Sequence, residues 1–140
     1  FAMETVFSHW QTLGDGTFES KIDQIRQMQT AGYFVLLIFV GLASVELSIG
    51  RVQTRVQENG HAVPEIKLRE RFPRTQMAIA EAIKVADASL LADNSRTSAQ
   101  AFTVCRVQIE EREIFDLRAG ERTTPSVISR WLEIVSPRVG

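Results

Sequence analysis

Two arginines, Arg51 and Arg55, are the side chains in this sequence best suited to bind an anion. They lie four residues apart in a segment with helical spacing, so their guanidinium groups share one helix face. A guanidinium group can grip two oxygens at once, and a pair of such groups suits a polyphosphate. From residue 51 to residue 74 the basic side chains outnumber the acidic ones. The other basic residues in this segment are Lys67, Arg69, Arg71 and Arg74, and the acidic residues are Glu58, Glu65 and Glu70. The pattern indicates an anion-binding patch, although such spacing is more often that of a solvated helix face.

Four other polar side chains are candidates for contact with a ligand. Glu4 interrupts an apolar strand, where a carboxylate could orient a substrate hydroxyl or transfer a proton, or simply face water. Asp93 and Asn94 directly follow a strand, where α/β folds place ligand-facing loops, but both residue types also favour plain turns. His61 lies in a short linker, and a lone histidine there is typical of an exposed loop.

The composition excludes several classes of protein. The 140 residues hold 16 Lys and Arg against 17 Asp and Glu, and this balance argues against a nucleic-acid partner. One cysteine, Cys105, and two histidines exclude an intrachain disulfide framework and a zinc site built on several cysteines. The longest apolar run, 33–40, is too short to span a membrane, so we expect no membrane contact and a cytoplasmic location. The chain lacks a Gly-x-x-x-x-Gly-Lys-Ser/Thr motif and hence a phosphate-cradling loop.

The hydrophobic pattern predicts one partial domain, 1–140, in which strands alternate with helices. We expect strands at 1–7, 33–40, 88–92, 102–109 and 112–117, and helices at 18–30, at 45–58, from Pro64 onward and from Pro125 to Val135. The run 33–40 is continuously apolar and is predicted to be buried on both faces, as in a parallel sheet. Pro73 is expected to break or kink its helix. The order predicts an α/β fold with a mostly parallel sheet, followed by a C-terminal β-hairpin and helix.

The segment 41–64, GLASVELSIGRVQTRVQENGHAVP, resembles the zeta-toxin-like family of P-loop kinases, in particular its uncharacterised bacterial members. The resemblance rests on a Ser-x-Glu-Leu helix start, an Arg-Val-x-x-Arg-Val pattern and a Gly-His-x-Val-Pro signature. It extends over about residues 1–95, through a Glu-Thr pair at Glu4 and Thr5, the arginines before Phe72, and the Asp-Asn-Ser turn at 93–95. Residues 96–140 are less distinctive.

The resemblance implies a phosphotransferase that moves a phosphoryl group from ATP or GTP, with Mg²⁺, to a small acceptor such as a nucleotide sugar. Members of this kind act in toxin–antitoxin systems, so an antitoxin is an implied partner. The implied roles are catalytic for Arg51 and Arg55, acceptor-binding for Glu4, Thr5 and His61, and nucleotide-binding for Arg51, Asp93 and Asn94.

In that family the first strand and its phosphate-binding loop precede the strand that opens this sequence. We therefore expect the 140 residues to be catalytically incomplete by themselves, and either to need a complementing N-terminal segment or to form a homo-oligomer. The alternative is a non-catalytic module that binds a nucleotide or a partner through the basic segment 51–74. An upstream phosphate-binding motif would favour the kinase, and a start codon just before Phe1 would favour the module.

Overall fold

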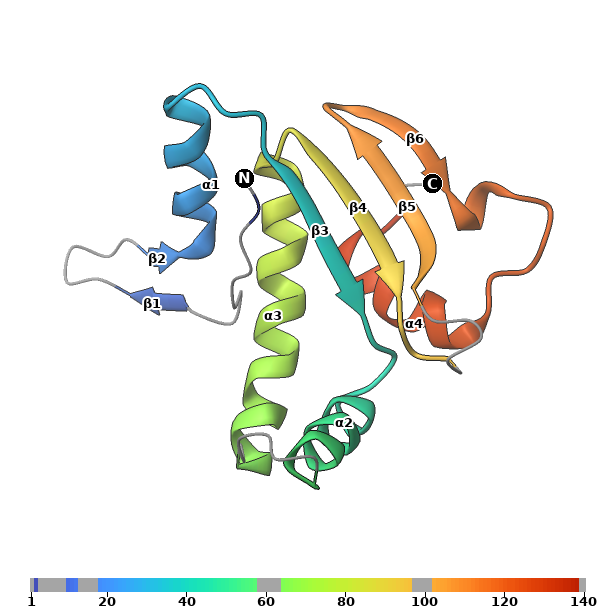
Figure 1. Ribbon diagram of the computed structural model, residues 1–140. Helices are drawn as coiled ribbons and strands as arrows, with labels where there is room; N and C mark the ends of the chain where they lie inside the picture. The colour runs from blue at the N-terminus through green and yellow to red at the C-terminus, as the bar shows by residue number, and fades with distance from the viewer. Residues whose placement is uncertain (1, 3–9, 13–17, 58–63, 97–101, 139–140) are drawn as a thin grey trace.

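The computed structural model describes residues 2, 10–12, 18–57, 64–96 and 102–138 (Figure 1). This part of the chain forms an α/β fold of four helices and a four-stranded mixed sheet, preceded by a separate antiparallel pair of strands. Its elements are β1 (Trp10–Thr12), β2 (Phe18–Ser20), α1 (Lys21–Thr30), β3 (Leu36–Gly41), α2 (Val45–Gln57), α3 (Glu65–Val85), β4 (Ala88–Asp93), β5 (Thr103–Ile109), β6 (Arg112–Asp116), the short 3-10 helix η2 (Leu117–Ala119) and α4 (Ser126–Val135).

The sheet has the strand order β3-β4-β5-β6, and only β3 and β4 run parallel. The prediction of a mostly parallel sheet is therefore wrong. A parallel pair needs a long crossover, and only the path from β3 through α2 and α3 to β4 provides one. The connection between β4 and β5 is short, and β5 joins β6 through a tight hairpin, so both of these pairs must be antiparallel.

Most predicted elements are confirmed, with two local corrections. The helix expected at 18–30 begins only at Lys21, because residues 18–20 pair with 10–12 as an antiparallel strand. Pro73 does not break its helix, since α3 runs continuously from Glu65 to Val85. Pro73 lies on the exposed side of α3, where water can reach the carbonyl that proline leaves unpaired. The strand predicted at 1–7 lies outside the described residues.

The core lies between one face of the sheet and the helices behind it (Figure 1). Its best-buried side chains come from α3, β4, β5 and α4, and include Ile79, Leu91, Cys105, Trp131 and Leu132. These residues follow the helical or alternating spacing of the sequence, which is why the pattern predicted their elements. Within the described residues, no helix is long and apolar enough to cross a membrane.

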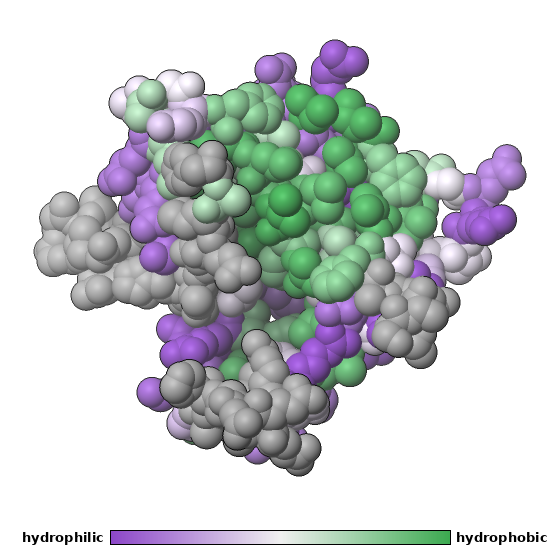
Figure 2. Space-filling model, in the orientation of Figure 1, coloured by the Kyte–Doolittle hydropathy of each residue, from purple (hydrophilic) through white to green (hydrophobic). Residues whose placement is uncertain are grey.

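The opposite face of the sheet is apolar and open. Leu36, Ile38 and Val40 of β3 are 52%, 61% and 40% exposed, in alternation with buried Leu37. Val104, Ile109 and Phe115 extend this open face across β5 and β6, and Figure 2 shows the resulting hydrophobic surface. The prediction that the run 33–40 is buried on both faces is therefore wrong for the described structure, because its helices cover only one side of the sheet.

Gly41, the last residue of β3, lies directly against Trp131 of α4. A Cβ atom at this position would come within 2.5 Å of the indole ring, far inside van der Waals contact. Trp131 is fully buried, so the ring has little room to move away. The close packing of α4 on the end of β3 therefore requires glycine at position 41.

We expect Gly41→Ala to lower the free energy of unfolding by about 3 kcal/mol, because the ring and the new methyl group cannot occupy the same space. Urea denaturation measures the change. Gly50→Ala is the matched control, since Gly50 lies in α2 and a methyl group added there would have no neighbouring atom within 4 Å. Alanine favours the helix and should stabilise by about 1 kcal/mol there. Equal stabilities of the Gly41 variant and the wild type would contradict the close contact with Trp131.

A buried ion pair joins the end of β6 to α4. The Asp116 carboxylate accepts hydrogen bonds from Arg118 Nε at 3.0 Å, Nη2 at 2.8 Å and the backbone N–H at 2.8 Å. Arg118 also donates to Ser136 O and to Glu133. Burial raises the pKa of the Asp116 carboxyl, but the hydrogen bonds from Arg118 outweigh burial and hold this pKa below its usual value.

Because the pKa of Asp116 is lower in the folded protein, the carboxylate stabilises the fold above its unfolded pKa of about 3.9 and loses this effect as pH falls through the folded value. Asp116→Asn should cost about 3 kcal/mol near neutral pH, because buried Arg118 then keeps only the half-exposed carboxylate of Glu133 as counter-charge. The difference from wild type should shrink in urea titrations at progressively more acidic pH. Glu81→Gln, at an exposed ion pair with Lys84, should change stability by less than about 0.5 kcal/mol. A difference that does not depend on pH would contradict the role of the ionised carboxylate.

Candidate anion site at the strand ends

The carboxyl ends of β3 and β4 bring several of the predicted site residues together. The two strands are parallel and in register, with Gly41 opposite Asp93, so both end at the same edge of the sheet. The chain continues from β3 through 42–44 into α2, and from β4 into the turn 94–96. Ligand-binding loops of α/β folds form at this kind of edge.

Hydrogen bonds join the two loops to each other. The backbone N–H of Asn94 donates to Gly41 O at 3.0 Å, and the N–H of Ala43 donates to Ser95 Oγ at 2.7 Å. These bonds fix the position at which α2 begins relative to the turn after β4. Because α2 carries Arg51, they also set where its guanidinium group lies.

The side chain of Arg51 reaches from α2 to this turn. Its Nη2 group donates a hydrogen bond to the backbone carbonyl of Asn94. Among the described residues this is the hydrogen bond that Arg51 makes, while a guanidinium group has five N–H donors. Arg51 is half-buried, so the remaining donors can reach a ligand at the edge of the sheet. The structure therefore brings Arg51 and Asn94, two of the predicted nucleotide-binding residues, into contact.

Asp93, the third predicted nucleotide-binding residue, is turned toward the protein interior. It is fully buried, and Oδ1 accepts hydrogen bonds from Trp131 Nε1 at 2.8 Å and from Ser95 Oγ at 2.7 Å. Oδ2 accepts a further bond from the backbone N–H of Ser95 at 3.1 Å. These contacts give the carboxylate a structural role, which is to hold the turn and α4 against the end of β4.

Cys105 lies near this carboxylate, and its thiol is unreactive. Burial raises the pKa of its thiol to about 12, and the negative charge of Asp93 adds to the effect. The thiol donates a hydrogen bond to Thr103 O at 3.3 Å. It therefore stays protonated at neutral pH and is no nucleophile. The sequence prediction that Cys105 is a core residue is confirmed.

Part of the basic segment 51–74 is neutralised by neighbouring acids. Arg69 pairs with Glu65 at 2.8 Å and with Glu46 at 3.2 Å. A backbone hydrogen bond at the start of α2, together with Arg69, lowers the pKa of Glu46. Arg69 therefore bridges α2 and α3 on the surface. At Arg69 the basic segment therefore forms a solvated helix face, which is the alternative to anion binding that the sequence left open.

Several predicted site residues lie beyond what the structure describes. Glu4, Thr5 and His61 are outside the described residues. Arg55 belongs to α2, but its side chain is not among those described.

Sequence reasoning missed Arg96, which adds a second guanidinium group at the same end of the sheet. Its Nη2 group donates to Thr103 Oγ1 at 2.8 Å, and its buried Nε has no partner among the described residues. The sequence feature that could have identified Arg96 is its position directly after the turn 93–95. Arg51 and Arg96 together give this edge a positive character, which suits an anionic ligand.

Among the described residues, no group of three or more His, Cys, Asp or Glu side chains gathers as a metal site would require. Comparisons with protein-family models, with curated proteins and with solved structures each gave no match. The resemblance to the zeta-toxin-like family therefore stays a prediction from the sequence.

Proposed function

We propose that this chain is the C-terminal part of an ATP- or GTP-dependent phosphotransferase that acts in the cytoplasm on a small-molecule hydroxyl acceptor, such as that of a nucleotide sugar. The observation that carries the proposal is the contact of Arg51 with the turn at the carboxyl ends of β3 and β4. This contact supports the role that the family resemblance implies for Arg51.

Phosphoryl transfer needs positive charge where negative charge develops. The acceptor oxygen bonds to the γ-phosphorus while the bond from that phosphorus to the bridging oxygen breaks, and charge spreads over the phosphate oxygens. The Asn94 carbonyl holds one Nη group of Arg51 at this edge, and the other N–H groups make no hydrogen bond with the residues that the structure describes. A pre-oriented guanidinium group stabilises such charge without reorganising during the reaction.

The chain supplies only part of this machinery. The sequence holds no phosphate-cradling loop, and the described residues form no carboxylate cluster for the Mg²⁺ that accompanies a nucleotide, so we assign no step to the metal. Asp93 accepts hydrogen bonds from Trp131 and Ser95, so we do not propose it as the base that accepts the proton of the substrate. A complementing segment with the phosphate loop and a base is therefore part of the proposal.

The open face of the sheet is where we place that segment. Six large apolar side chains on this face are each 40% or more exposed, and Tyr33, Phe34 and Phe102 flank them. A contiguous apolar surface of this kind is typical of a face that contacts another protein segment. β3 is also an edge strand in the described sheet, with backbone groups that a further strand could pair.

In the protein complemented by its phosphate-binding segment, Arg51→Ala should lower kcat about a thousandfold and change nucleotide affinity much less, because its charge acts on the transition state. Steady-state kinetics and equilibrium titration of the nucleotide separate the two effects. Arg130→Ala, on the exposed side of α4, removes an arginine of the same kind away from the site and should alter neither. Equal losses of kcat and affinity, or a normal kcat, would contradict the role; nucleotide binding without any transfer would favour the non-catalytic module.

Without the complementing segment, the 140-residue chain should self-associate through the open face. Ile38→Lys places a charge at the centre of this face and should shift the chain toward monomer in sedimentation velocity experiments. Met77→Lys is the matched control, since Met77 of α3 is 67% exposed and Ile38 is 61% exposed. Wild-type chain that stays monomeric and unfolds cooperatively would overturn this prediction.

A further inference from the structure

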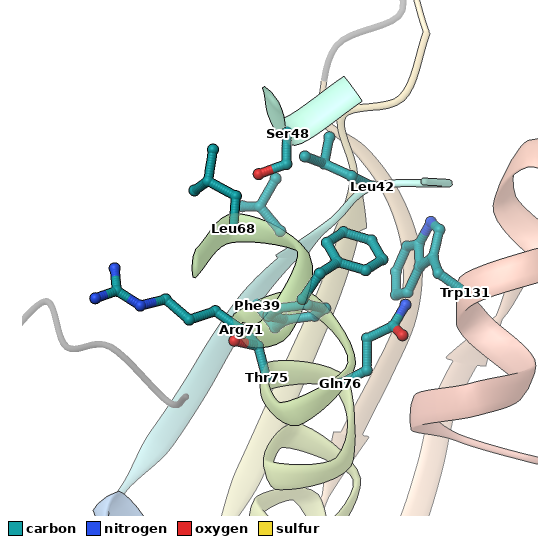
Figure 3. A pocket seen from close by; sticks show the side chains of 10 residues that line it. Phe39, Leu42, Ser48, Leu68, Arg71, Thr75, Gln76 and Trp131 are labelled. Atoms are coloured by element: carbon teal, nitrogen blue, oxygen red, sulfur yellow. The ribbon is translucent and has the colours of Figure 1, made fainter. Parts of the chain in front are cut away.

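A pocket of about 190 Å³ lies beside the anion site, between the end of β3, the first turns of α2, the middle of α3 and the indole of α4 (Figure 3). Its walls are mainly apolar and aromatic, with Phe39, Leu42, Leu68 and Trp131 among the lining side chains. Ligand sites in proteins commonly have this character, in which apolar walls carry a few polar groups that fix orientation.

One polar group stands out on the wall of this pocket. Gln76 of α3 is only 8% exposed, yet its carboxamide has no hydrogen-bond partner among the described residues. Figure 3 shows the carboxamide directed toward the rings of Phe39 and Trp131. The fully buried polar atoms without a partner in the described residues are Ser89 Oγ and Arg96 Nε, so the amide atoms of Gln76 instead face the open space of the pocket. They are therefore accessible to a ligand, and a polar group at this place in an apolar wall would fix the ligand's orientation.

The walls restrict the shape of that ligand. The rings of Phe39 and Trp131 meet edge to face, with centroids 5.9 Å apart and an interplanar angle of 74°. Aromatic walls of this kind favour a planar ring as a neighbour. A cavity of roughly 150 Å³ holds one benzene ring, so this pocket has room for a somewhat larger planar group.

We propose that the pocket binds a nucleobase that presents an amino group beside a ring nitrogen, as adenine does. The carboxamide of Gln76 would accept a hydrogen bond from the amino group and donate one to the ring nitrogen, a two-bond pairing that suits glutamine and adenine. An acyl chain would leave the amide of Gln76 without a hydrogen-bond partner.

The base site goes beyond the proposed phosphotransferase. Ser48 lines the pocket one helical turn before Arg51, so the base site and the anion site share α2. The base site nevertheless depends on the pocket alone and needs neither phosphate nor Arg51. The result of a binding test with the free base is therefore independent of the result of the kinetic test of Arg51.

The experiment titrates adenine into the full chain and follows the emission of Trp131 in a Trp10→Phe background, which leaves Trp131 as the only tryptophan. We expect saturable quenching, and an affinity about tenfold higher for adenine than for purine, which lacks the amino group. Gln76→Leu should weaken adenine binding at least tenfold and abolish the preference over purine. Gln27→Leu, the same change on the exposed side of α1, should leave both affinities unchanged.

Three results would overturn the proposal. These are the absence of saturable adenine binding at millimolar concentration, equal binding of adenine and purine by the wild type, and unchanged adenine affinity in Gln76→Leu. Circular dichroism shows whether Gln76→Leu is folded, and we expect a melting temperature at least equal to that of the wild type. Should this variant not fold, the adenine–purine comparison on the wild type still decides.

Discussion

The buried carboxylate of Asp93 is the group on which this end of the sheet depends. It accepts a hydrogen bond from the indole N–H of Trp131, which would otherwise be a buried donor without a partner. It also accepts hydrogen bonds from the hydroxyl group and the backbone N–H of Ser95. Trp131 in turn packs on Gly41, and Ser95 binds the N–H of Ala43 before α2. One buried side chain thus links α4, both parallel strands and the helix that carries Arg51. Because its hydrogen bonds are shielded from water, each is stronger than a comparable bond on the surface.

The two parallel strands, β3 and β4, are apolar on both faces, and apolar residues of β5 and β6 extend one of these faces. Leu37 and Leu91 pack into the core, while Leu36 and Ile38 stand open on the other side. Strands with this pattern are typical of sheets covered on both sides. The described helices cover one side only, so apolar area that could stabilise the fold remains in contact with water.

Periodicity and turn chemistry predicted most elements correctly, because the burial of a single helix or strand face is a local property. The mostly parallel sheet was predicted wrongly, because alternation with helices implies parallel strands only where a crossover helix intervenes, and none lies between β4 and β5. The C-terminal hairpin was predicted correctly, since β5 and β6 are antiparallel neighbours in the sheet. Asp93 stands out in the sequence as a polar residue after a strand, but its partner Trp131 is distant in sequence and only the fold brings the two together. Gln76 gave no signal, since one polar residue in an amphipathic helix is ordinary until the cavity beside it is known.

The contact between Arg51 and Asn94 makes the position of the guanidinium group depend on the turn after β4. The carbonyl that holds the guanidinium group belongs to the turn that Asp93 fixes, so Arg51 is positioned by the core without being part of it. A single hydrogen bond to a neutral carbonyl is weak beside the bidentate contact that a phosphate offers. An anion at this edge can therefore bind the remaining N–H groups of Arg51 while Asn94 remains in place through its bond to Gly41. The turn and the position of Arg51 both depend on the same buried carboxylate.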